Sequence, residues 1–162
     1  TPPLGRILRC FHEFRLEQED LLAKHGRVLG CPVHSLGAEV ATTDPELRDR
    51  LQEILAEFLT FYESAIRDGQ EDGSVVTGDA SMLARMVFAF SEGLLLHARM
   101  KNDLAPLDDF EVGALHLLTA GAVLHGTPSS PCLAGWEATG IDGRRAAAVI
   151  LGDLTRAHGL AG

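Results

Sequence analysis

The side chains that could support chemistry in this chain are chiefly seven histidines and three cysteines, spread along 162 residues. No two histidines stand four residues apart, and no HExxH or CxxC motif accompanies them, so the usual metal-binding spacings are missing. The chain also has no Gly-x-Ser-x-Gly elbow, P-loop or dinucleotide fingerprint. We therefore expect no metal site, no cofactor and no enzymatic activity, and we interpret the histidines as solvated or core residues.

Two local arrangements near the first third of the chain leave room for acid–base or thiol chemistry. Glu39 follows His34 by five residues, which allows an acid–base pair or, more simply, a surface hydrogen bond or a helix cap. Cys31 lies in a turn, but a reactive thiol needs a basic neighbour that lowers its pKa, and only Arg27 is close in sequence. We therefore expect neither arrangement to be a catalytic centre.

The composition of the chain limits the kinds of partner that it is expected to bind. The chain has 14 Lys and Arg against 23 Asp and Glu, a net charge of −9, and its basic residues never gather beyond pairs such as Arg144-Arg145. Because nucleic-acid binding depends on clustered positive charge, we do not expect this chain to bind DNA by itself. It lacks the apolar run that a membrane span needs, and its three cysteines form no disulfide pattern. These features predict a cytoplasmic protein without a membrane partner.

The hydrophobic pattern predicts an all-α fold, a bundle of about five to seven helices. The first helix covers about 4–25 and ends at Gly26, a residue suited to the position after a helix. A turn at 30–32 then leads to a short helix near 35–41.

The third helix is the longest and has the clearest start. Thr43 or Asp44 can cap it, Pro45 is tolerated in its first turn, and Glu46 can complete a capping box with Thr43. Leucines, aromatics and alanines then share one stripe, which indicates an amphipathic helix ending near Gly69.

The next two helices, about 79–100 and 107–125, are apolar around most of their circumference. A helix of this kind in a soluble protein must be covered on more than one side. We therefore expect these last two bundle helices to meet their counterparts in a second copy about a two-fold axis. Gly113 and Gly121 would allow a neighbouring backbone to approach closely.

The run Gly30-Cys31-Pro32, followed by Leu36, Glu39 and the Asp44-Pro45 helix start, resembles a junction in the effector-sensing half of TetR-type transcriptional regulators. The resemblance covers about 4–125. It implies a two-fold four-helix interface made by the last two bundle helices, and a cavity that binds a small, mainly apolar or aromatic effector. It also implies an N-terminal helix-turn-helix unit that this sequence does not contain. The chain is then a truncated form, part of a longer chain, or a naturally shortened relative.

Facing stripes of aromatic residues and a few polar groups define the expected ligand cavity, although each aromatic alone is equally suited to an ordinary core. For Glu92, with Arg85 on the same helix, effector recognition stands beside a buried pair or a dimer contact, and the sequence does not rank them. The residues expected at the cavity are Phe11, Phe14, His34, Phe58, Tyr62, Met86, Phe90 and Glu92. The residues expected at the dimer interface are Leu94, His97, Phe110, Leu117, Leu118 and Gly121.

These expectations combine into one functional hypothesis. Residues 1–126 form a ligand-binding and dimerisation domain of a TetR-like repressor, whose effector relieves DNA binding by the missing helix-turn-helix domain. Residues 127–162 form a linker and a last helix that packs on the same domain, with Trp136 over the bundle or the cavity mouth. The alternatives are a homodimerisation module without a ligand and, less favoured, a small helical-bundle enzyme.

Overall fold

The computed structural model describes residues 2–119, which belong to one compact unit. Within the described residues the structure is entirely helical and contains no strand, which confirms the all-α prediction. The predictions for Gly121, Trp136 and the 127–162 tail lie outside the described residues. The elements in chain order are α1 (Pro3–His25), α2 (Pro32–Val40), α3 (Pro45–Glu71), α4 (Ala80–Lys101), the 3₁₀ helix η1 (Ala105–Asp108) and α5 (Asp109–Thr119).

The helix starts follow local capping chemistry. In α3 the Asp44 carboxylate accepts a hydrogen bond from the Leu47 amide at 3.0 Å. Asp44 as the N-cap places Leu47 at the third helical position, so the expected capping box between Thr43 and Glu46 is wrong. Thr43 Oγ1 instead donates to the Val40 carbonyl at the end of α2. The short helix α2 begins three residues earlier than expected, because Pro32 is its first residue and needs no hydrogen-bond acceptor for its nitrogen.

Two helices, α1 and α4, are each followed by a residue in the left-handed conformation. Gly26 after α1 has φ 68° and Asn102 after α4 has φ 51°. The Asn102 side chain also accepts a hydrogen bond from the Val28 amide at 2.9 Å and donates to the Gly26 carbonyl at 3.2 Å. The end of α4 is thereby connected to the segment that leads from α1 to α2.

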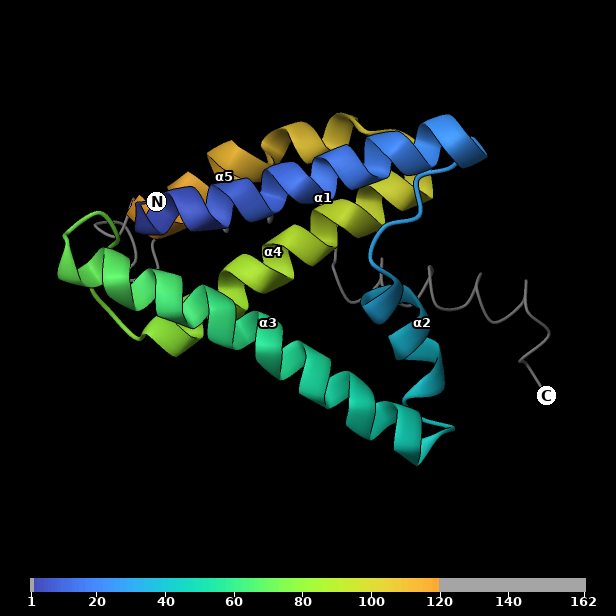
Figure 1. Ribbon diagram of the computed structural model, residues 1–162, viewed down its shortest axis with the longest axis horizontal. Coiled ribbons are helices and arrows are strands. Elements are labelled where there is room, and N and C mark those ends of the chain that lie inside the picture. Colours follow the sequence, from blue (N-terminus) through green and yellow to red (C-terminus); the bar gives the residue numbers. More distant parts are fainter. Residues whose placement is uncertain (1, 120–162) are drawn as a thin grey trace, which may run out of the picture. The chain divides into compact units, whose positions relative to one another are not determined.

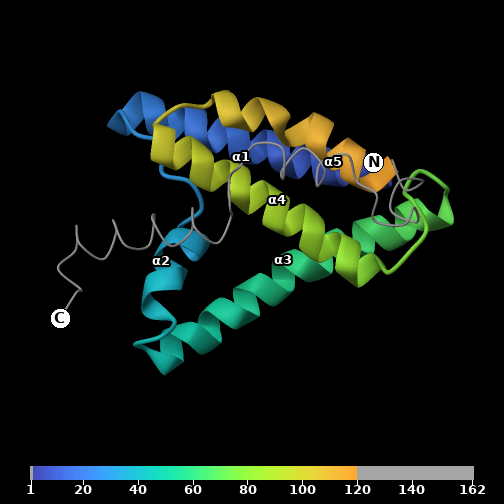
Figure 2. The ribbon, with the colours of Figure 1, turned by 180° about the vertical axis from the view of Figure 1, so that it is seen from behind.

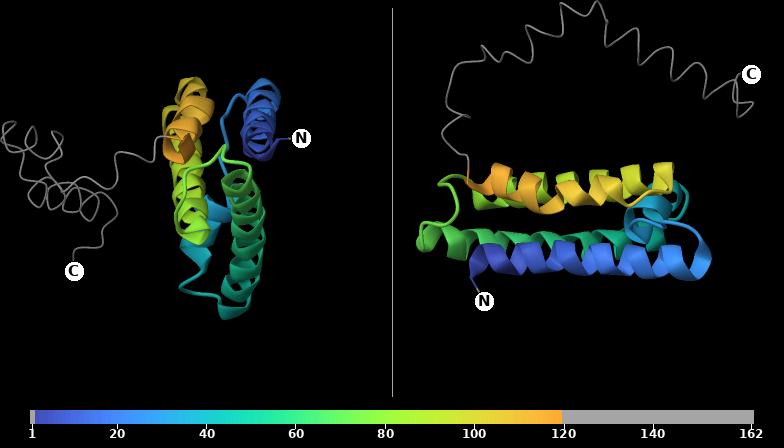
Figure 3. Two further views of the ribbon diagram at one scale, coloured as in Figure 1. Left: turned by 90° about the vertical axis from the view of Figure 1, so that its left-hand side faces the viewer. Right: turned by 90° about the horizontal axis from the view of Figure 1, so that it is seen from above.

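The helices of this unit form two layers, which Figure 3 shows most directly. One layer contains α1 and α3, and the other contains α4 and α5. Across the layers α3 packs against α4, and α1 packs against α5 (Figure 1). The short helix α2 contacts α3 and closes the side of the unit on which α1 and α3 diverge (Figures 1 and 2).

The core between the two layers is rich in aromatic rings. Phe11 of α1 stacks on Phe110 of α5 with ring centroids 4.9 Å apart, and its ring lies 6.2 Å from Tyr62 of α3. Phe58 and Phe88 continue the cluster, with centroids 5.9 Å apart, toward α2. Burial of such rings stabilises the fold through area and through edge and offset contacts. Among the helices in 2–119, none has the length and hydrophobicity required to cross a membrane.

Candidate functional site

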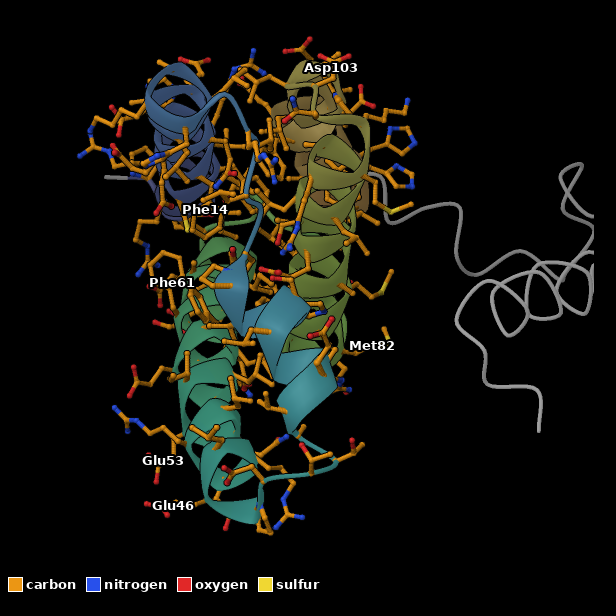
Figure 4. The ribbon with its side chains drawn as sticks, turned by 90° about the vertical axis from the view of Figure 1, so that its right-hand side faces the viewer. Phe14, Glu46, Glu53, Phe61, Met82 and Asp103 are labelled. Atoms are coloured by element: carbon orange, nitrogen blue, oxygen red, sulfur yellow. The ribbon has the colours of Figure 1, made fainter. Side chains whose placement is uncertain are left out.

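A cavity of about 370 Å³ lies between the segment before α2, α2 itself and α4. This volume is within the range of small-molecule sites. Figure 4 views the unit with α2 in front of α3 and α4. Two of the expected ligand residues, His34 and Glu92, line this cavity. Its full lining consists of Gly30, Cys31, His34, Ser35, Ala38, Glu39, Glu92, Leu96 and Arg99.

Glu92 is the most unusual residue of the cavity. It is 4 % exposed, and its Oε2 atom has no hydrogen-bond partner among the described residues. His34 Nδ1 lies 3.3 Å from this oxygen, which allows an ion pair when His34 is protonated but lacks the alignment of a hydrogen bond. Burial raises the pKa of the Glu92 carboxyl above its ordinary value of 4.5, while a hydrogen bond from the Cys31 thiol to this carboxyl and the charge of His34 act in the opposite direction. A buried carboxyl oxygen without a hydrogen bond is costly.

The neighbours of Glu92 argue against thiol chemistry. Cys31 is the N-cap of α2, and burial, with the nearby Glu92, raises the pKa of its thiol. The thiolate is therefore disfavoured, and the interpretation of Cys31 as a reactive thiol loses support. His34 faces Glu92 and also packs edge-on against Phe88, with centroids 5.8 Å apart. Although Glu39 lines the same cavity, the carboxylate within ion-pair distance of His34 belongs to Glu92.

A buried amide from α1 holds the rear of this cavity in place. Gln18 is 2 % exposed, and its Oε1 accepts hydrogen bonds from the amides of Leu29 and Gly30 at 3.1 and 2.7 Å. Gly30 has φ 66°, and a Cβ added there would lie 3.2 Å from the Leu95 carbonyl oxygen, so a glycine is needed. The sequence analysis missed Gln18. The available signal was a polar residue at position 18 on the apolar stripe that contains Phe11 and Phe14.

The expected aromatic ligand residues do not share one cavity. Phe11 and Tyr62 are buried in the core, where burial raises the pKa of Tyr62 and its hydroxyl lies 3.8 Å from Cys10 Sγ. Phe14 packs against Phe58 with centroids 6.5 Å apart. Phe58 lines a second cavity of about 350 Å³, whose other lining residues are Cys10, Ile54, Glu57 and Phe61.

Met86 and Phe90 are both half-buried on α4. The Phe90 ring lies against the backbone of α5, because a Cβ added at Gly113 would come within 2.1 Å of that ring. Gly113 therefore leaves room for the Phe90 side chain of the same protein chain. This contact explains the need for a small residue at Gly113 without a second copy.

The expected interface residues also separate into two groups. Phe110 and Leu118 are 4 % and 0 % exposed and belong to the core of a single chain. His97 is exposed, and Leu94 and Leu117 are half-buried. The most exposed apolar side chains of these two helices were missed, and in Figure 4 the labelled one, Met82, points outward from α4 on the side away from α3. They are Met82, Leu96, Met100 and Val112.

The exposed apolar residues of α4 belong to a continuous stripe along this helix. Positions 82, 86, 89, 93, 96 and 100 alternate steps of four and three residues, and Leu96 belongs both to this stripe and to the lining of the cavity. Met100 is 74 % exposed and Val112 of α5 is 69 % exposed. Such spacing is typical of a helix that packs along a partner helix. Across 2–119, no group of three or more His, Cys, Asp or Glu side chains gathers closely enough to hold a metal ion.

The chain matches a known protein family. The family model described as "Tetracyclin repressor-like, C-terminal domain" matches residues 6–112. A search of curated proteins and a search of solved structures each return no match. The matched segment includes α1 through the beginning of α5 and every residue that lines the cavity beside Glu92. This chain belongs to the tetracycline-repressor-like C-terminal domain family, whose members are regulatory domains.

Proposed function

We propose that this chain senses a small, mainly apolar or aromatic effector in the cavity beside Glu92 and forms a homodimer. In this proposal it is the regulatory half of a TetR-like repressor, and effector binding relieves DNA binding by a helix-turn-helix domain. The observation that carries the proposal is the buried, unpartnered Oε2 of Glu92 at a cavity of about 370 Å³. A structural core residue would have its oxygen satisfied, whereas a ligand site leaves that role to the ligand.

The proposed mechanism is a shift between arrangements of the dimer. A ligand changes an equilibrium only by the difference between its affinities for the two states. Here the cavity contains Gly30, which Gln18 connects to α1, and Leu96, which belongs to the exposed stripe of α4. An effector that displaces Gly30 or Leu96 would therefore move α1 or the proposed interface.

Thermal unfolding of the chain against a library of apolar and aromatic metabolites tests the sensor function. A ligand that binds only the native state raises stability by about 2.7 kcal/mol at a hundredfold excess over Kd. We expect Ala38→Trp, which fills the cavity from the exposed side of α2, to remove the shift. Ala56→Trp is the matched control, because Ala56 is an exposed alanine on α3. Equal shifts in both variants would place the effector elsewhere.

The proposed dimer interface is the outer face of α4 and α5. Sedimentation equilibrium of Met100→Glu and Val112→Glu tests it, because these changes add charge at exposed positions and should leave the folded monomer intact. We expect both variants to dissociate. Substitution of Leu118 is a poor test, since this residue is fully buried and a charge there would unfold the monomer. A dimer that survives both substitutions would argue for a different interface.

A further inference from the structure

The chemical character of the cavity beside Glu92 restricts which small molecules it would hold. Apolar contact is available from Ala38 and Leu96, and Glu92 contributes a buried carboxyl. Glu92 is a residue of the α4 interior, with a side chain 3 % exposed, so water contributes little to its solvation. A ligand group that reaches Oε2 would therefore replace a missing hydrogen bond, and the gain is largest when that group also carries the opposite charge.

The charges that line the cavity favour a cation. Glu39 and Glu92 supply two acidic groups against the guanidinium of Arg99, and His34 adds positive charge only when it is protonated. Arg99 lies in the last turn of α4, where a positive charge already complements the carbonyl end of the helix dipole. The chain as a whole carries a net charge of −9, which attracts cations and repels anions. The side chain of His34 is about half exposed, and although its Nδ1 lies 3.3 Å from Glu92 Oε2, it makes no hydrogen bond to this oxygen.

We propose that the effector carries a basic nitrogen that donates to Glu92 Oε2, while its apolar body lies against Ala38 and Leu96. This inference rests on the proposed sensor function and adds the chemical class of the ligand, an aryl or alkyl amine. A neutral apolar molecule of the same shape would pack against the same two residues but would leave the carboxyl oxygen without a hydrogen bond. A carboxylate ligand would place like charges side by side at Glu92.

Three probes of one shape separate these cases: tryptamine is a cation, 3-ethylindole is neutral and indole-3-propionate is an anion. Isothermal titration of the 162-residue chain gives the affinity of each. We expect tryptamine to bind at least tenfold more tightly than 3-ethylindole, and indole-3-propionate to bind most weakly. In Glu92→Gln the preference for tryptamine should fall below threefold, while the affinity for 3-ethylindole stays unchanged.

Glu17→Gln is the matched control, because it removes one carboxylate at an exposed position of α1 that does not line the cavity, and it should keep the tenfold preference. Equal affinities for the three probes, tightest binding of indole-3-propionate, or a preference that survives Glu92→Gln would overturn the assignment of an amine ligand. If 3-ethylindole binds the unmodified chain but not Ala38→Trp, the sensor function stands in each of those cases. If no probe and no library compound binds, both proposals fall.

Discussion

Gln18 and Glu92 are buried to almost the same extent, 2 % and 4 % exposed, yet their polar atoms have opposite surroundings. Both the oxygen and the nitrogen of the Gln18 amide form hydrogen bonds with the segment before α2, at Leu29 and Gly30. The Glu92 carboxyl, on the other side of that segment, has one oxygen without a hydrogen bond. A satisfied buried group stabilises one conformation, whereas an unsatisfied one lowers stability. The comparison indicates a structural role for Gln18 and motivates the binding role that we propose for Glu92.

The largest expected effect is a loss of stability in Gln18→Leu. Leucine has a similar volume but leaves the amides of Leu29 and Gly30 without their acceptor. Each buried unsatisfied amide costs about 1–3 kcal/mol, so the free energy of unfolding should fall by about 2–3 kcal/mol in a urea titration. A change smaller than about 0.5 kcal/mol would show that Gln18 is no more structural than a surface residue, and the comparison would fail.

Asn102→Ala should have a smaller effect on the same segment. It removes the side-chain acceptor of the Val28 amide and places alanine, which tolerates the left-handed region less well than asparagine, at φ 51°. We expect a loss of about 1–2 kcal/mol from the hydrogen bond and the left-handed backbone. The control is Asn102→Gly, which relieves the backbone cost and should lose less. Equal losses in the two variants would mean that only the hydrogen bonds matter.

Glu92→Gln should act in the opposite direction and change the dependence on pH. Burial raises the folded-state pKa of Glu92 above 4.5, so the unmodified protein loses stability as the pH rises through that folded-state pKa. Glutamine does not titrate, and at pH 7.5 the variant should be more stable by up to about 1 kcal/mol.

Melting temperatures of both proteins between pH 4 and pH 8 measure this effect. The advantage of Glu92→Gln should shrink toward pH 4, where the unmodified carboxyl is protonated in the folded and unfolded states. A variant that is less stable than the unmodified protein at pH 7.5 would mean that the ion pair with His34 outweighs desolvation. Glu92 would then be a structural residue like Gln18.

The fold could be predicted from the sequence because its signals are local. Helical periodicity, Asp44 before Pro45 and Gly26 after α1 act within one or two turns of the chain, and the structure contains the corresponding helices. The division of the aromatic residues was harder to predict. Phe11 and Phe58 follow equally good helical stripes, but only the packing between layers decides that they border different cavities, Phe11 beside Phe110 of α5 and Phe58 beside Phe61.

The site could be predicted only in part, for the same reason. His34 and Glu92 are 58 positions apart in the sequence, and their approach depends on where α2 lies against α4. Gln18 was missed because its partners, Leu29 and Gly30, belong to an irregular segment without a periodic signal. Interface residues such as Leu118 were assigned from hydrophobicity alone, which does not separate the inner face of a helix from its outer face.

The central claim is that the effector binds between α2 and α4, and amide chemical-shift mapping by NMR tests it most directly. A compound that raises the melting temperature would be titrated into ¹⁵N-labelled protein. The account predicts that the largest shifts fall at Cys31, Ala38 and Glu92, which line the cavity. Largest shifts at Ile54 and Phe61 would place the ligand in the second cavity and contradict the account.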